Sequence, residues 1–191
     1  MLSSTKVLDR IGTIFAPGSD KGSGRIDLWS AAWHAYATHP ALGLGGGGFE
    51  ATSLQYLQNT PGVNIAASYV AAGRPVHNAY LEALVDLGPI GLALFLVALG
   101  LSGVYLVRAS MRFRRAGRVE LQRISLALVT SLVGLCVSMF FLSIGLGHAV
   151  WIFAGLALAL DRVSEHALVR ADERAAVPST APGGEARHEP E

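Results

Sequence analysis

The residues of this sequence most suited to chemistry are His77 and Asn78, which stand where a polar segment gives way to a long apolar one. Pro75 can begin a helix, because its missing N–H would be unsatisfied at a helix start, so we expect His77 in the first helical turn. The positive end of the helix dipole favours a neutral imidazole there, which can accept a proton as a general base. Taken alone, a histidine that only packs at a helix start is the commoner explanation.

Other ionisable side chains offer two further possibilities. A carboxylate base is the main rival to His77, and the candidates are Glu50, Glu82 and Asp86. His34 and His39 could form a metal pair, but Pro40 directly follows the second histidine and no third ligand has matching spacing. The sequence therefore predicts no metal site.

The composition places the chain in a membrane. Of its 191 residues, 51% are hydrophobic and only 15% are charged, which is too apolar for an ordinary soluble domain. Residues 87–107 contain no charged side chain and are long enough to cross a hydrocarbon core of about 30 Å as a helix. The net charge of +1 excludes a strong global field for nucleic acid. The single cysteine, Cys136, excludes an intramolecular disulfide.

The charge pattern after this span sets the expected topology. Residues 108–123 hold six arginines and one acidic residue, the bias of a short cytoplasmic loop, which explains the cluster better than nucleic-acid binding does. Residues 124–160 are uncharged apart from one histidine and too long for one span, so we expect a two-helix transmembrane hairpin turning at 143–148. Residues 1–86 then lie outside the cytoplasm, and 161–191 form a disordered cytoplasmic tail.

Within the outer region we expect two helices joined by a glycine turn. Residues 25–38 have a helical pattern that Pro40 ends. One side of this helix carries Ile26, Trp29, Trp33 and Tyr36. That side suits core packing or a membrane interface, and a sugar-stacking platform is the less favoured alternative. Residues 43–49 contain a formal G-x-G-x-x-G, but no strand precedes it and no Lys-Ser or Lys-Thr follows, so the glycines predict a tight turn with positive φ. A short helix over 49–58 comes next.

Together these segments resemble a known family. His77-Asn78, followed after nine residues by Gly88-Pro89-Ile90-Gly91, is similar to the H-[NSQ]-x9-G-x2-G signature of the O-antigen ligase and O-antigen polymerase superfamily. The entrance of that family's large periplasmic loop resembles two further segments, Gly24-Arg25-Ile26-Asp27-Leu28-Trp29 and His39-Pro40-Ala41-Leu42-Gly43-Leu44-Gly45 with Phe49. The order and spacing of the pieces also fit, over about residues 10–160.

The resemblance implies an all-α, multi-pass glycosyltransferase of the bacterial inner membrane that needs no metal or cofactor. It would move a glycan from an undecaprenyl-diphosphate-linked donor to an acceptor hydroxyl on the periplasmic side, with His77 as the base. Arg25 is carried over from the loop motif as the cation for the departing diphosphate, since a guanidinium forms bidentate hydrogen bonds. Arg74 is a second cation by proximity. Asn78 would orient the sugar or the histidine, and Tyr80 would contact the acceptor.

Length is where the sequence departs from this family, which implies many more membrane spans than the three or so expected here. We therefore expect the C-terminal portion of such a fold, inactive by itself, with membrane lipids and an upstream chain carrying the missing transmembrane helices as partners. The alternative is a non-catalytic membrane accessory protein or a degenerate paralogue that keeps the loop fold. The residues do not choose among a ligase, a polymerase and a protein glycosyltransferase, nor among glycan, lipid A core and protein acceptors.

Overall fold

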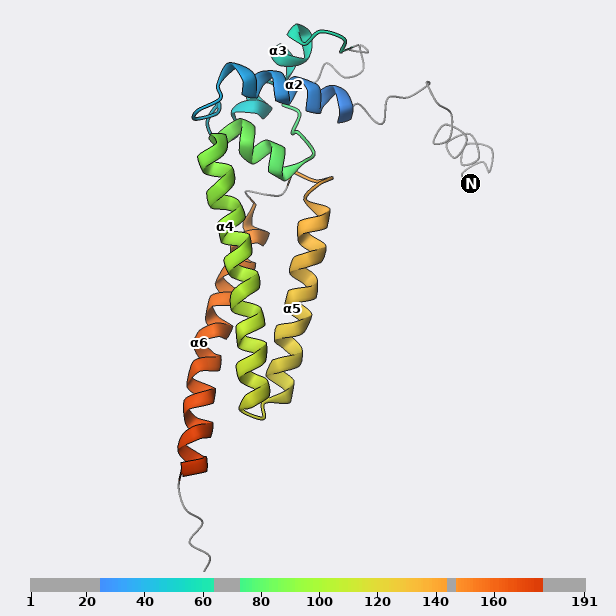
Figure 1. Ribbon diagram of the computed structural model, residues 1–191. Coiled ribbons are helices and arrows are strands. Elements are labelled where there is room, and N and C mark those ends of the chain that lie inside the picture. The colour runs from blue at the N-terminus through green and yellow to red at the C-terminus, as the bar shows by residue number, and fades with distance from the viewer. Residues whose placement is uncertain (1–24, 64–72, 144–146, 177–191) are drawn as a thin grey trace, which may run out of the picture.

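The computed structural model describes residues 25–63, 73–143 and 147–176, and every regular element in these ranges is an α-helix (Figure 1). The helices are α2 (Arg25–Thr38), α3 (Gly48–Asn59), α4 (Ala79–Arg115), α5 (Val119–Ser138) and α6 (His148–Ala176). α2 confirms the helix expected over 25–38, and α3 extends the one expected over 49–58 by one residue at each end. The start of the predicted outer region, residues 1–24, and the end of the predicted tail, residues 177–191, lie outside the described residues.

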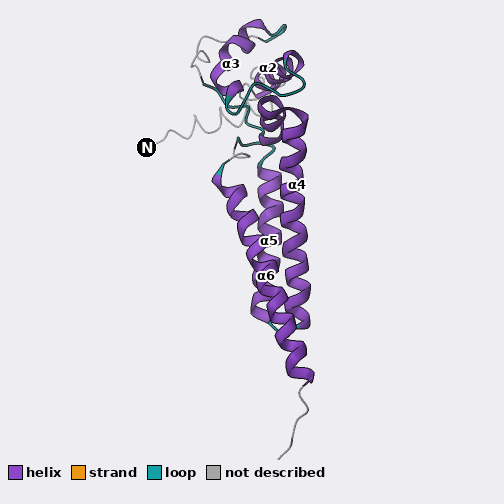
Figure 2. Cartoon of the chain, turned by 90° about the vertical axis from the view of Figure 1, so that its left-hand side faces the viewer, coloured by secondary structure: helices purple, strands orange, loops and turns teal. Residues whose placement is uncertain are grey.

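Three long helices form a bundle, and the two short helices lie at one of its ends. α4 packs along both α5 and α6, as Figures 1 and 2 show from two sides. The core of the bundle includes Phe95, Leu99, Leu106, Leu132, Met139, Val150 and Ala157. α2, α3 and residues 73–87 form a second packed unit, which we call the head. The core of the head includes Leu28, Phe49, Leu57, Val76 and Val85.

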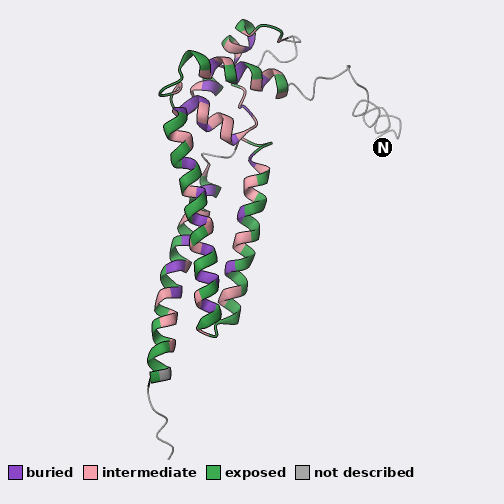
Figure 3. Cartoon of the chain, viewed as in Figure 1, coloured by how far each residue is buried: buried purple, intermediate pink, exposed green. Residues whose placement is uncertain are grey.

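The bundle has the surface of a membrane protein. α4 and α5 are each long and apolar enough to cross a membrane. Only 22% of the most apolar stretch of α4 and 11% of that of α5 is buried, whereas the core helix of a soluble protein is mostly buried (Figure 3). The exposed positions of these helices are largely aliphatic, which suits contact with lipid. The chain is therefore an all-α membrane protein with two candidate spans.

α6 does not confirm the third predicted span. It lies beside α4 and follows the turn expected near 143–148, but it is not among the described helices that are long and apolar enough to span. Its apolar part, residues 148–160, would measure about 20 Å at 1.5 Å per residue. That is short of the roughly 30 Å of a hydrocarbon core.

The prediction that the last helix ends at Asp161 and that a disordered tail begins there is wrong for residues 161–176, because α6 continues to Ala176. The charges that were expected to end it are paired instead. Arg112 of α4 lies 2.8 Å from the carboxylate of Asp161, which is 5% exposed. Arg162 pairs with Glu165 one turn along, at 3.2 Å. Because each of these charges is balanced by a neighbouring side chain, the charged residues can remain within the helix instead of ending it.

The arginine-rich segment predicted as a loop over 108–123 is mostly helical. α4 continues to Arg115 and α5 begins at Val119, so only residues 116–118 connect them. This connection lies at the end of the bundle opposite the head (Figure 1). The arginines therefore mark one end of the bundle, and the head marks the other.

The buried face of α2 carries small side chains rather than aromatic ones. The residues buried there are Leu28, Ala31, Ala32 and Ala35. Ile26 and Trp33 are 58% and 59% exposed, whereas Trp29 and Tyr36 of the same side are partly buried and pack against the core of the head, so core packing holds for those two alone. Three alanines allow a close approach to the rest of the head, which the larger aromatic rings would prevent. A membrane-interface or sugar-stacking role for the exposed rings stays a prediction.

Candidate functional site

The site is organised by a break in α4. Gly88 has a φ of 70° and a ψ of −174°, which divides α4 into an arm over 79–87 and a long segment from Pro89. A Cβ at Gly88 would lie 2.5 Å from the carbonyl oxygen of Ala41, so this position must be a glycine. Proline suits the first position of the second segment, because its missing N–H needs no partner there. The same missing N–H leaves the Val85 carbonyl without its helical donor.

The glycine turn before α3 fills this break. Leu44 N–H donates to the Val85 carbonyl at 2.9 Å, and Gly45 N–H donates to the Asp86 carbonyl at 2.8 Å. A Cβ at Gly43, whose φ is 69°, would lie 2.5 Å from the Val85 carbonyl oxygen. The predicted tight turn with positive φ is thus confirmed. We call this backbone contact between the glycine turn and the helix break the glycine seam.

Asp86 is a structural carboxylate, a role that the sequence did not reveal. It is 1% exposed, and its side chain accepts hydrogen bonds from the N–H groups of Gly47 and Phe49, both at 2.9 Å. These amides belong to the start of α3, whose N-cap residue is a glycine without a capping side chain. Burial raises the pKa of Asp86, and the hydrogen bonds from Phe49 and Gly47 oppose that rise. Asp86 therefore caps α3 from the neighbouring helix arm. The sequence signal for this role is a helix start preceded only by glycines, which have no side chain that could cap the helix.

Replacing Asp86 with alanine is expected to destabilise the head by about 3 kcal/mol, because two buried amides lose their acceptor. Asp86→Asn keeps one acceptor oxygen and should cost less. Thermal unfolding followed by the fluorescence of the tryptophans in α2 measures the loss. Glu50→Ala removes the same charge from an exposed position of α3 and should change little. Equal losses in Asp86→Ala and Glu50→Ala would contradict the capping role.

His77 has a backbone conformation that is unusual for a residue other than glycine. Its φ is 56°, the one positive φ at a non-glycine position within the described ranges. Segments far apart in the chain hold it there. Ser143, after α5, accepts the His77 N–H at 2.8 Å, and the indole N–H of Trp29 in α2 donates to the Val76 carbonyl at 3.1 Å. Strained backbone that is held by its surroundings is typical of functional sites.

α4 begins later than predicted. Its N-cap is Asn78, whose Oδ1 accepts the N–H groups of Tyr80 and Leu81, both at 3.1 Å. The prediction that Pro75 starts the helix is wrong, because the asparagine supplies the acceptor that the first amides need. His77 therefore precedes the helix instead of lying in its first turn. Its backbone is still beside the positive end of the arm.

Two side chains predicted to bind substrate have structural partners in this conformation. Asn78 is the cap just described. The Tyr80 hydroxyl donates to the Cys136 carbonyl of α5 at 2.9 Å, and its ring centroid lies 6.2 Å from that of Phe95 and 4.7 Å from that of Phe140. Tyr80 thus joins the arm to the bundle. Contact of either side chain with a sugar or an acceptor stays a prediction.

The two predicted cations lie on segments that are bonded to the neighbourhood of His77. Arg25 is the half-buried first residue of α2, one turn before Trp29 and on the same side of the helix. Trp29 in turn bonds to the residue before His77. The Arg74 N–H donates to the hydroxyl of Ser53 in α3 at 3.0 Å. The head therefore brings the start of α2, the helix α3 and residues 74–77 to one end of α4.

Glu82 is the most unusual carboxylate of the head. Its Oε2 is buried and has no hydrogen-bond partner among the described residues. Burial raises the pKa of Glu82, and the nearby Asp86 and Glu50 raise it further, while a hydrogen bond with Ser143 opposes the rise. Ser143 therefore contacts both the His77 backbone and the Glu82 carboxylate. The sequence placed Glu82 among the rival bases but did not connect it with the turn after α5.

Fold and site together define an all-α membrane protein whose helical head holds a histidine just before the start of α4. Residues 2–96 match the family model described as O-antigen ligase, and the chain belongs to that family. The match includes α2, α3, His77 and the helix break, and it ends in the first turns of the long segment of α4. No curated protein and no solved structure matches the chain.

Proposed function

We propose that the head carries the transfer site of a lipid-linked glycan transferase of the O-antigen ligase or polymerase type. The donor is a glycan on undecaprenyl diphosphate, and the acceptor is a hydroxyl group in surface polysaccharide biosynthesis. The observation that supports this best is His77, held in a left-handed backbone conformation by contacts from separate segments at the start of α4. Fixing a reactive group in this way lowers the cost of aligning it with a substrate.

The proposed reaction has one proton transfer and one displacement. The His77 imidazole takes the proton of the acceptor hydroxyl, whose oxygen forms a bond to the anomeric carbon of the donor sugar. The bond from that carbon to the diphosphate oxygen breaks, and the lipid diphosphate leaves with the electron pair. Arg25 and Arg74 are the proposed cations for this leaving group, because guanidinium groups suit phosphate oxygens.

The charge distribution supports an extracytoplasmic head. Arginines gather at the ends of α4 and α5 that meet at residues 116–118, opposite the head. Positive residues beside short loops favour the cytoplasmic side of a membrane. The proposed site then faces the periplasm in a multi-pass protein of the bacterial inner membrane, where lipid-linked glycans are consumed.

Glu82 is the second candidate for the base, favoured by its buried oxygen without a partner. Its raised pKa also makes a stability prediction. A raised native pKa means that the folded head binds the proton more tightly than the unfolded chain, so stability is greatest at acidic pH and falls as pH rises through the native pKa. Glu82→Gln should reduce this fall, which begins as the pH rises above the ordinary pKa of a glutamate, in thermal unfolding experiments, whereas the control Glu50→Gln should keep most of it. An identical pH dependence in wild type and Glu82→Gln would contradict the assignment.

A deletion strain tests the proposed function. We expect undecaprenyl-linked glycans to accumulate and surface polysaccharide to shorten or lose its attachment, and expression of the wild-type chain should restore both. The experiment belongs in cells, where any partner chain with further membrane helices is present. An unchanged glycan profile would favour the non-catalytic accessory protein instead.

A further inference from the structure

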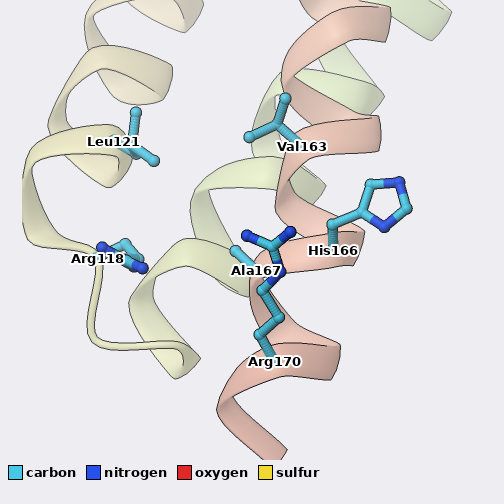
Figure 4. A pocket seen from close by; sticks show the side chains of 6 residues that line it. All are labelled: Arg118, Leu121, Val163, His166, Ala167 and Arg170. Atoms are coloured by element: carbon cyan, nitrogen blue, oxygen red, sulfur yellow. The ribbon is translucent and has the colours of Figure 1, made fainter.

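A groove lies at the arginine-rich end of the bundle, far from the head. It has a volume of about 440 Å³ and opens between the start of α5 and the second half of α6 (Figure 4). Its lining residues are Arg118, Leu121, Val163, His166, Ala167 and Arg170. None of these residues belongs to the proposed transfer site.

The groove presents two arginines from opposite walls. Figure 4 shows Arg118 beside the start of α5 and Arg170 extending from α6 into the space between the helices, while the His166 ring points away from α5. Within the described part of the chain, the ion pairs of this end involve Arg112 and Arg162, and neither groove arginine forms one. Arg118 is also the N-cap residue of α5, so the positive end of that helix faces the same place.

The wall next to the arginines is apolar and continues onto the exposed surface of the bundle. Leu121 and Val163 line the groove on the side nearer the apolar parts of α5 and α6, and Val163 is 48% exposed. Ile124, one turn along α5, is 50% exposed. Two cations are thus followed directly by a strip of aliphatic side chains along the candidate span α5.

We propose that this groove binds an anionic phospholipid from the leaflet that surrounds the arginine-rich end. The headgroup phosphate lies between Arg118 and Arg170, each donating N–H groups to its oxygens, and an acyl chain follows Leu121 and Val163 towards the bilayer centre. Basic pockets between membrane helices on the cytoplasmic side suit such headgroups. The inference rests on membrane residence and on the proposed cytoplasmic placement of the arginine-rich end, and it is independent of the proposed transferase reaction.

Native mass spectrometry of the purified chain, released from phosphatidylcholine bilayers containing graded amounts of phosphatidylglycerol, tests the proposal. We expect wild type to retain phosphatidylglycerol in preference to phosphatidylcholine. Arg118→Gln with Arg170→Gln should weaken that retention about 30-fold. The matched control is Arg123→Gln with Arg174→Gln, which removes the same charge from exposed positions of the same helices outside the groove and should keep the preference. Ala167→Trp keeps both arginines but fills the groove, and it should also abolish retention.

Three results would overturn the proposal. Equal lipid retention in wild type, the Arg118/Arg170 variant and Ala167→Trp would show that the groove is not the site. An equal loss in the Arg123/Arg174 control would assign the effect to general surface charge. Displacement of the lipid by millimolar inorganic phosphate would show a site for free phosphate rather than for a lipid headgroup.

Discussion

Loss of the His77 imidazole is expected to abolish glycan transfer in cells while the protein remains in the membrane. A positioned base contributes about 10²- to 10⁴-fold to the rate of a proton-transfer step, so transfer should fall at least 100-fold. His77→Asn is the cleanest variant, because asparagine tolerates the positive φ of 56° better than alanine does. The measurement is the length and attachment of surface polysaccharide in a deletion strain that expresses each variant, normalised to the amount of protein in the membrane.

Glu82→Gln provides the contrast that identifies the base. If His77 is the base, Glu82→Gln should keep transfer within a few-fold of wild type, since the amide preserves the shape of the side chain. Wild-type transfer in His77→Asn, together with a loss in Glu82→Gln, would assign the base to Glu82. Loss in both variants with normal membrane levels would indicate that the two groups act together through Ser143, which contacts both segments.

The second large effect is expected at Gly88. Alanine at this position would require an unfavourable φ of 70°. Its Cβ would also lie 2.5 Å from the Ala41 carbonyl oxygen, and the backbone there cannot move away without a large loss of stability. We expect Gly88→Ala to destabilise the head by at least about 3 kcal/mol and to expose α2 and α3 to limited proteolysis. The bundle of α4, α5 and α6 should remain protected.

Gly100→Ala is the matched control for that substitution. Gly100 is in the same helix, and a Cβ there would meet nothing within 4 Å. The exchange should be neutral or stabilise the helix by up to about 1 kcal/mol. If Gly88→Ala and Gly100→Ala resisted protease equally well, the close approach at the helix break would not be required for folding.

Local signals were sufficient for the short helices and insufficient for the carboxylates. Pro40 and the glycines mark the ends of α2 and α3 in the sequence itself, so the extents of both helices were predicted to within a residue. Pro75 and Asn78 are both local signals for a helix start, and α4 starts at the later one because the asparagine side chain accepts the first amides of the helix. The roles of Asp86 and Ser143 depend on partners far away in the chain, which spacing and periodicity do not reveal.

The end of α6 was misplaced for a similar reason. Asp161 resembles a helix-terminating charge until Arg112 of α4 is placed beside it. A charge pattern shows that a residue must be solvated or paired, and only the packing of the helices decides which. The same limit applies to the aromatic side of α2, where Trp29 and Tyr36 pack against the core of the head while Ile26 and Trp33 are exposed.

The glycine seam also makes two of the segments that resemble the family's motifs energetically one unit. Gly43 lies in residues 39–45 and Gly88 in residues 77–91, and a Cβ at either glycine would clash at the same backbone contact. Once either substitution has opened that contact, the other has little left to disrupt, so the double variant should cost clearly less than the sum of the single ones. Changing both segments should therefore reduce stability little more than changing one of them. The two segments are expected to be kept or lost together among related sequences.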